Sequence, residues 1–277
     1  MSGTETAAPP LAGAARRNFL AGAPMSRLVH DRPARRTGQE AGRQVVTLTL
    51  FRFPSMGAVL QVLSMPSVLM RLGRVPGVGF ARMMGTGSAF GFDPWPNFPV
   101  WAVLAGWEDE AAARAGIESP LWAARRARAE ECCTLFLRPL SASGRWGGWA
   151  PFESAPEAAR EAEADGLPLA VLTRATVRLA NAVSFWRRVP PINAQIADEP
   201  GMLFRVGMGE VPLLHQVTFS VWRDAEAMRA FAYRGRGHAE AIRMVREGGW
   251  FSEELYARFA VTGSEGRWQG GAPLRAG

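Results

Sequence analysis

Five side chains in this sequence are histidines or cysteines, the types that hold redox metals, and four of them lie beyond the N-terminal segment: His215, His238, Cys132 and Cys133. Imidazole nitrogens and thiolate sulfurs are the common protein ligands of haem iron and of other transition metals. A third histidine, His30, lies in an N-terminal segment without hydrophobic periodicity. The two later histidines are therefore the first places to look for redox chemistry.

His238 stands at the start of an amphipathic helix predicted within the stretch Arg234–Phe259. Ala241, Ile242 and Val245 recur at three- and four-residue spacings, which place side chains on one helix face. A helix would fix this imidazole in space, and a histidine facing an apolar sheet can hold haem iron while the opposite face stays open. The alternative interpretation is a structural or surface histidine.

His215 opens a predicted strand and is interpreted as a hydrogen-bonded edge residue. A non-haem iron site would need two histidines and a carboxylate around one metal. His215 and His238 could supply the pair, with Glu210 or Glu240 as the carboxylate, but nothing in their spacing demands it. A haem ligand and a non-haem triad both stay open from the residues alone.

Cys132 and Cys133 are adjacent, so they cannot readily adopt disulfide geometry with each other. No glycine-rich loop of the kind that surrounds a haem thiolate flanks them, and buried apolar thiols are favoured. A reducing, cytoplasmic compartment is therefore expected. No run reaches the roughly 20 apolar residues that a spanning helix needs, so any membrane contact is expected to be peripheral.

Composition and charge exclude several function classes. The chain has 277 residues, of which 48% are hydrophobic, enough for a sizeable core. Of the net charge of +7, residues 1–44 carry +4 through seven Arg and three acidic residues, so nucleic-acid binding is not favoured. No dinucleotide-binding GxGxxG turn, Walker sequence, GxSxG elbow or CxxC pair is present, and hydrolase and NTPase chemistry are not indicated.

Residues 1–44 are rich in Ala, Gly, Pro and Arg, a composition typical of a disordered tail. The alternative interpretation is that the start codon has been assigned too far upstream. Arg16 and Arg17 resemble the start of a twin-arginine export signal. No apolar h-region follows them, so export is not expected.

Beyond the tail the sequence predicts the order strand, helix, strand, strand, helix, strand, and then the same order again. The predicted strands are 45–53, 77–87, 100–107 and 134–140, then 169–179, 201–209, 215–222 and 255–262; the predicted helices are 56–72, 108–116, 119–131 and 182–197, with more after Trp222. The halves also match in sequence, since GVGFARMMGTG aligns with GMLFRVGMG, WEDEAAARA with WRDAEAMRA, and SGRWGG with EGRWQGG.

We therefore expect an α+β fold of two tandem ferredoxin-like (βαββαβ) repeats that form an α/β barrel. The repeats are residues 45–153 and 167–270, and residues 154–166 are the linker between them. His238 falls where the first repeat has Ala123, so the halves are not functionally equivalent. Ten Trp and fifteen Phe, many of them on strands, would together suit a long hydrophobic ligand.

Several stretches resemble the spheroidene monooxygenases of carotenoid biosynthesis in purple photosynthetic bacteria. They are LTLFRFPSMGAVLQVLSM, PGVGFARMMGTGSAFGFDPWPNFPVWAVLAGW, LFLRPLSASGRW, LTRATVRLANAVSFWRRVP and GEVPLLHQVTFSVWRDAEAMRAFAYRGRGHAEAIRMVREGGWFSEELYARF. The resemblance covers residues 45 to about 270. The tail departs from the family pattern.

The resemblance implies oxidation at C-2 of an acyclic carotenoid such as spheroidene, giving a ketone (spheroidenone) by two successive hydroxylations and loss of water. It implies haem b, O2 as co-substrate and an external electron donor such as reduced ferredoxin. The enzyme would be cytoplasmic and peripheral on the inner membrane, where the apolar helix 56–72 could rest on the bilayer. His238 is our assignment for the axial ligand, and so for the catalytic, cofactor-binding and metal-binding residue. A non-haem α/β-barrel domain that binds a small apolar ligand, and an interaction protein that tethers carotenoid enzymes, are the competing interpretations.

Overall fold

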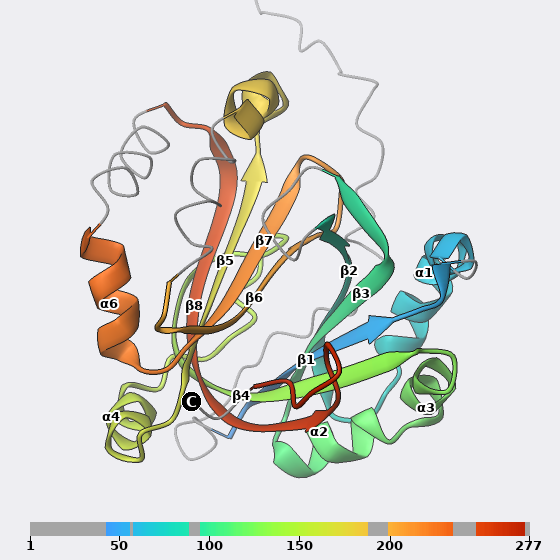
Figure 1. The fold of residues 1–277 in the computed structure, drawn as a ribbon, viewed down its shortest axis with the longest axis horizontal. Helices are drawn as coiled ribbons and strands as arrows, with labels where there is room; N and C mark the ends of the chain where they lie inside the picture. The colour runs from blue at the N-terminus through green and yellow to red at the C-terminus, as the bar shows by residue number, and fades with distance from the viewer. Residues whose placement is uncertain (1–42, 56–57, 89–94, 188–198, 235–247, 275–277) are drawn as a thin grey trace, which may run out of the picture.

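Eight antiparallel strands close into one barrel in the order β1-β3-β2-β6-β7-β5-β8-β4 (Figure 1). The computed structural model describes residues 43–55, 58–88, 95–187, 199–234 and 248–274. The expected α+β barrel is thereby confirmed. His238 and most of the predicted tail lie outside the described residues.

The strands are β1 (Val45–Arg52), β2 (Val78–Gly87), β3 (Pro96–Trp107), β4 (Glu131–Gly144), β5 (Leu169–Val177), β6 (Met202–Gly209), β7 (His215–Trp222) and β8 (Phe251–Gly266). The helices are α1 (Ala58–Leu72), α2 (Glu110–Ile117), α3 (Pro120–Arg126), α4 (Pro156–Ala164) and α6 (Ala225–Arg234), with a 3-10 turn η4 (Leu179–Asn181) leading into helical residues 182–187. The predicted helix 119–131 is shorter than expected, because Glu131 already pairs with Arg52 in the sheet. Pro66 lies inside α1 without ending it.

The two halves of the barrel share one strand order. It reads β4-β1-β3-β2 in the first half and β8-β5-β7-β6 in the second, so β3 and β7 occupy corresponding places. A long β4–β8 seam joins the halves on one side. On the other side the β2–β6 seam has only two paired positions, Gly85 with Gly209 and Thr86 with Met208.

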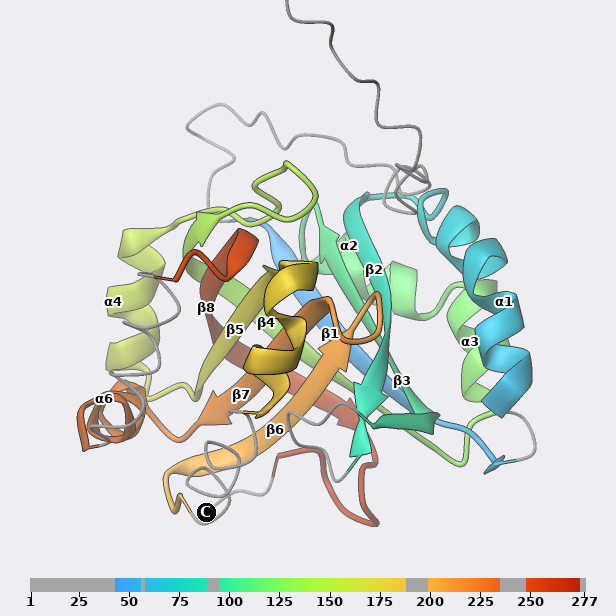
Figure 2. The same ribbon diagram turned by 90° about the horizontal axis from the view of Figure 1, so that it is seen from above.

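Helices cover the outside of the barrel, and side chains fill its inside. Figures 1 and 2 show α1, α2 and α3 against the first half, α6 against the second, and α4 beside β4 where the two halves meet. Alternate strand residues point to opposite faces, so Leu48 and Leu50 of β1 fill the barrel while Phe51 packs under the first-half helices. Both faces of β1 are therefore buried, which explains its nearly continuous apolar sequence.

The predicted linker 154–166 contains a helix that packs on the barrel. α4 has Pro156 in its first turn, a position where proline loses no helical hydrogen bond. Its Ala158 and Ala162 are buried in the cluster that contains Leu140 of β4. This connection is thus part of the packed structure.

Each half ends in the same tight turn. Gly144 ends β4 with φ 97°, and Gly266 ends β8 with φ 86°. After the first of these glycines, Trp146 and Trp149 exchange two backbone hydrogen bonds, and after the second Trp268 and Gly271 do the same. The sequence match between SGRWGG and EGRWQGG is therefore a match in structure as well.

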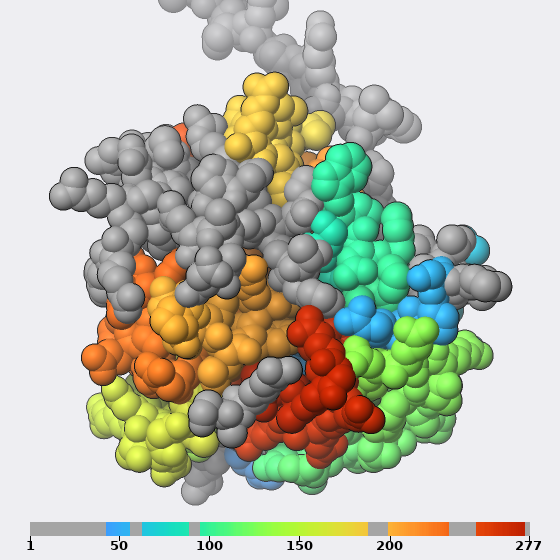
Figure 3. All heavy atoms as spheres, in the orientation of Figure 1, coloured from blue at the N-terminus to red at the C-terminus, as the bar shows by residue number. Residues whose placement is uncertain are grey.

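Glycine is required where these turns begin. A Cβ at Gly144 would lie 2.1 Å from the carbonyl oxygen of Glu254, and a Cβ at Gly266 would lie 2.2 Å from that of Cys132. Left-handed backbone and close approach both favour glycine there. The turns bury Trp146 and Trp268 against the barrel interior, and Figure 3 shows the C-terminal segment, in red, across the front of the molecule.

Candidate functional site

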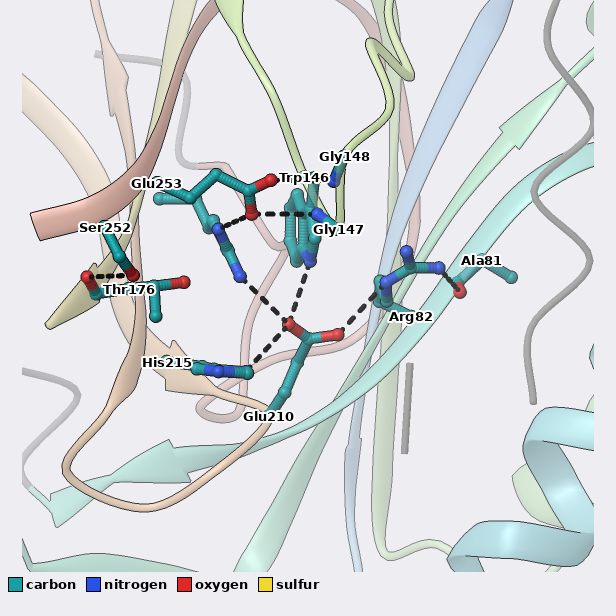
Figure 4. Close-up of polar contacts among 11 residues, drawn as sticks. Ala81, Arg82, Trp146, Gly147, Gly148, Thr176, Glu210, His215, Ser252 and Glu253 are labelled. Carbon is teal, nitrogen blue, oxygen red and sulfur yellow. Dashed lines mark hydrogen bonds and ion pairs between the residues drawn. The ribbon is translucent and has the colours of Figure 1, made fainter. Parts of the chain in front are cut away.

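Two arginines are buried inside the barrel. Arg82 of β2 and Arg174 of β5 are each 2% exposed, and a buried charge needs a partner of opposite sign. The Glu210 Oε1 atom lies 3.0 Å from Nε of Arg82, and a guanidinium nitrogen of Arg174 binds the carboxylate of Glu253 (Figure 4). The four side chains come from both halves of the barrel.

Glu210 is the centre of this cluster. Its Oε2 atom accepts a hydrogen bond of 2.8 Å from the indole Nε1–H of Trp146. The same oxygen lies 3.6 Å from Nδ1 of His215 and 4.0 Å from the guanidinium of Arg174. Glu210 lies in the loop after β6 and His215 is the first residue of β7, so this hairpin supplies both a carboxylate and an imidazole to the cluster.

Glu253 is held by the turn that follows β4. The backbone N–H groups of Gly147 and Gly148 donate to its carboxylate at 2.9 Å and 2.7 Å. Both glycines have left-handed φ angles, 65° and 86°, which turn successive N–H groups toward one anion. The turn, β8 and β5 are thereby tied together through one carboxylate.

Both carboxylates are held in the charged form. Burial raises the pKa of Glu210, but the hydrogen bond with His215, the charges of Arg82 and Arg174 and the Trp146 N–H together outweigh it and leave the pKa below its usual value. Glu253 behaves similarly. Burial raises its pKa, and the two backbone N–H groups and Arg174 bring it below the usual value. At neutral pH these groups position and neutralise their neighbours, and they do not act as acids.

At the other end of the barrel a second glutamate, Glu131, accepts hydrogen bonds from a tight turn in the same way. Gly144 at the end of β4 pairs with Leu255, and Gly266 at the end of β8 pairs with Cys133. Glu253 lies two residues before Leu255, and Glu131 lies two residues before Cys133, so Glu131 corresponds to Glu253. Glu131 accepts hydrogen bonds from the Gly270 N–H and from Nε of Arg52, both at 2.8 Å. A glutamate that binds the N–H groups of the Trp turn is therefore common to both ends.

The buried arginines are not common to both ends. Arg174 pairs with Leu255 in the second half, and Leu50 pairs with Cys133 in the first half. Since Leu255 and Cys133 correspond, Leu50 occupies the position in the first half that Arg174 occupies in the second. By the same strand registers Val206 corresponds to Arg82, Thr86 to Glu210 and Val100 to His215. The cluster of Arg82, Arg174, Glu210 and His215 is thus found at one end of the barrel and has no counterpart at the corresponding positions of the other.

Relatives of known name match nearly the whole folded chain. Spheroidene monooxygenase of Rhodobacter capsulatus is 44% identical over 232 residues, which is 83% of this chain and 95% of that protein. The chain belongs to the spheroidene monooxygenase family. The protein is a monooxygenase. Spheroidene monooxygenase of Cereibacter sphaeroides is also 44% identical, over 83% of this chain and 71% of that protein.

Two further comparisons bear on the fold of this family member. A model of a domain of unknown function, DUF3291, matches residues 171–261, which run from β5 into β8. A crystal structure of aldoxime dehydratase is 12% identical and covers 84% of this chain and 86% of its own, with a TM-score of 0.53. That likeness shows a shared fold.

Among the metal-ligand candidates read from the sequence, the structure describes His215, Cys132 and Cys133, and His238 lies outside the described residues. His215 is more than an edge residue, because its side chain faces Glu210 inside the cluster. Burial raises the pKa of Cys132 to about 11 and that of Cys133 to about 12. Cys133 is buried, as predicted, whereas Cys132 is only partly buried.

Sequence reasoning missed Arg82, Arg174, Glu253 and Trp146. A signal was present, since each arginine faces inward from a strand on which a residue two positions away is apolar. For Arg82 both such residues, Phe80 and Met84, are apolar. A charge in such a position indicates a buried ion pair. The partners could not be named, because they come from other strands and from a turn.

The donor chemistry around His215 fits an imidazole ligand. A carboxylate on one ring nitrogen fixes the orientation of the ring and leaves the other nitrogen for a metal, an arrangement common at metal sites. In the part of the chain that the structure describes, no three His, Cys, Asp or Glu side chains gather as a metal site, and no helix is long and apolar enough to cross a membrane.

Proposed function

We propose that this protein is a haem-dependent carotenoid monooxygenase that oxidises C-2 of an acyclic carotenoid such as spheroidene to the ketone. Two successive hydroxylations at one carbon give a geminal diol, and loss of water gives the ketone, as in spheroidenone. Each hydroxylation places one oxygen atom of O2 in the substrate and reduces the other to water with two electrons and two protons. An external donor, proposed as reduced ferredoxin, supplies the electrons.

The observation that carries this proposal is the 44% identity to a spheroidene monooxygenase over 95% of that protein's length. A match of that extent leaves no large part of the relative without a counterpart here. The apolar interior and the aromatic strands agree with a hydrophobic substrate.

His238 is proposed as the axial ligand of haem b, with His215 as the rival. When bound, haem would supply the activation of dioxygen. Within the barrel, Glu210 would orient His215, and the paired Arg82 and Arg174 would keep that carboxylate ionised.

The two halves are proposed to be tandem ferredoxin-like units, residues 45–153 and 167–270. Their equal strand order and their equal Trp turns support this proposal. Residues 1–42 are proposed to be a dispensable tail; the predicted bound at residue 44 is too late, because Gln44 is buried and hydrogen-bonded to Pro151 and Glu153. The enzyme is proposed to work in the cytoplasm at the inner membrane surface, because a water-insoluble substrate has to be collected from lipid.

An absorption spectrum and a turnover assay test the function together. The purified protein should show a Soret band that shifts with dithionite and carbon monoxide, and with O2 and reduced ferredoxin it should convert spheroidene to its ketone. A colourless protein that still forms the ketone would refute haem dependence alone. A protein that forms no oxidised carotenoid under any of these conditions would refute the proposed reaction.

A second candidate is a barrel that binds a small apolar ligand without haem or oxygenation. It is favoured by one observation: a crevice of about 80 Å³ at the β2–β6 seam has no charged side chain in its lining. Binding of an apolar ligand without a Soret band and without turnover would support this candidate.

A further inference from the structure

The crevice lies on the outer side of the barrel, where the two halves barely touch. It has a floor of strand glycines and a rim of larger side chains, contributed by Gly85, Gly207, Gly209, Trp186, Leu213 and Gln216. An ideal Cβ built on Gly85 would meet nothing within 4 Å, so the space above that strand is open. Because Met84 and Met208 point into the barrel, the neighbouring glycines face outward.

The first half has large side chains at the corresponding places. Met83 and its partner Val103 in the first half correspond to Gly207 and its partner Thr218 in the second. The side chains of Met83 and Val103 are buried under helices. Trp101 corresponds to Gln216, since each pairs with a glycine at the end of the seam. The second half therefore lacks the bulk that fills this layer in the first half.

An exposed apolar surface adjoins the crevice. Leu179 is 78% exposed, Val183 is 64% exposed and Leu213 is 44% exposed. A second, more open hollow is lined by Ala182, Val183, Trp186, Leu213 and one charged residue, Arg187, and shares Trp186 and Leu213 with the crevice. A contiguous apolar surface of this kind on a protein exterior indicates a binding site for an apolar partner.

Leu213 is held in an unusual conformation at the junction of the two hollows. Its φ of 67° lies in the left-handed region, which a residue with a branched side chain adopts only under constraint. The Nε1–H of Trp186 donates a 3.0 Å hydrogen bond to the Leu213 carbonyl, and the Leu214 N–H donates to Val211 within the same turn. These bonds fix both the rim and the exposed leucine.

We propose that the acyclic end of the carotenoid binds in this crevice, and that the chain of the polyene lies along the surface formed by Leu179, Val183 and Leu213. The inference rests on the proposed function and names where its substrate is held. A polyene is flat, one carbon chain thick, uncharged and long. The uncharged lining, the bare glycine floor and the adjoining apolar surface each match one of those properties. A macrocycle with charged carboxylates would find no counter-charge in the lining of this crevice.

A bulky residue on the glycine floor tests the inference. In Gly85→Leu the new side chain would occupy the open space, so we expect spheroidene in detergent micelles to bind at least about tenfold more weakly, measured by the induced visible circular dichroism of the polyene. The far-ultraviolet spectrum and the Soret band should stay as in the parent protein. Gly271→Leu is the matched control, because a Cβ there also meets nothing within 4 Å and Gly271 lies outside the crevice. It should bind spheroidene like the parent.

Equal spheroidene affinity in Gly85→Leu and Gly271→Leu would overturn the inference. If Gly85→Leu fails to fold, Val183→Glu carries the test, since this side chain is mostly exposed and its replacement spares the core. Unchanged binding by Val183→Glu would then overturn the inference. A parent protein that binds spheroidene without oxidising it contradicts the proposed function alone, and one that does not bind it contradicts both.

Discussion

Arg82 and Glu210 join the two halves of the barrel, with Nε of the arginine 3.0 Å from Oε1 of the glutamate. They face each other across the β2–β6 seam, which has only two paired backbone positions. Arg82 also lies over the ring of Phe80, 4.4 Å from its centroid. A buried ion pair thus supplements the weakest part of the sheet.

Glu210→Gln should destabilise the fold. The amide keeps the shape of the side chain but leaves the charge of Arg82 without its main partner, and breaking a buried pair costs about 3 kcal/mol or more. Urea unfolding followed by circular dichroism should show this loss.

The control for that variant is Glu265→Gln. Glu265 pairs with Arg114 at 2.8 Å, but both side chains are about half exposed, and such surface pairs contribute less than about 1 kcal/mol. Equal losses in the two variants would mean that burial of the Arg82–Glu210 pair has no special weight.

Stability should fall in acid. The pKa values of Glu210 and Glu253 lie below their usual values in the folded protein, so the unfolded chain binds protons at higher pH than the folded chain does. Their contribution is complete above the unfolded pKa of about 4.5 and is lost as the pH falls through the folded values. Unfolding free energies measured between pH 7 and pH 3 should drop below about pH 5, and Glu210→Gln should drop less steeply. The same pH dependence of the unfolding free energy in Glu210→Gln and in the parent protein would contradict a contribution from Glu210.

Deletion of residues 1–42 should leave stability and activity unchanged, whereas deletion of residues 1–44 should cost about 1–2 kcal/mol. Gln44 is buried, and its amide group binds the Pro151 carbonyl and the Glu153 N–H, both at 3.0 Å. Thermal unfolding of the two truncated proteins separates the outcomes. Equal melting temperatures would show that Gln44 contributes nothing.

His238→Ala should shift or abolish the Soret band and stop ketone formation, because the iron would lose its proposed axial ligand. His215→Ala should keep the haem and alter the charged cluster only. Absorption spectra of both variants decide the matter. Loss of the Soret band in His215→Ala with an unchanged spectrum in His238→Ala would reverse the assignment and make the carboxylate-oriented His215 the ligand.

Helix α1 is predicted to contact membranes through its outer face. Leu63 is 73% exposed and Met70 is 47% exposed, while Leu69 packs toward the core. Leu63→Glu is therefore a cleaner probe than a change at Leu69. The parent protein should float with liposomes of bacterial lipid and Leu63→Glu should float less, with Val183→Glu as the comparison at the other apolar surface. Unchanged flotation of Leu63→Glu would exclude α1.

The sequence by itself determined the strands. Alternating or continuous apolar runs predicted all eight strands, and β7 was predicted with its observed bounds, His215–Trp222. The matched GRW segments correctly indicated equal turns, because glycine at a left-handed position is a local requirement that one chain segment shows. Such features depend on residues close in sequence, and so they can be read from it.

Only the tertiary structure decided which side chains meet. Arg82 and Glu210 are 128 positions apart, and nothing local to either predicts the other. Closure of the barrel brings β2 and β6 together, and burial in that apolar interior makes each charge require its partner. The difference between the two barrel ends, Arg174 on one side and Leu50 on the other, likewise emerges only when the strand registers are fixed.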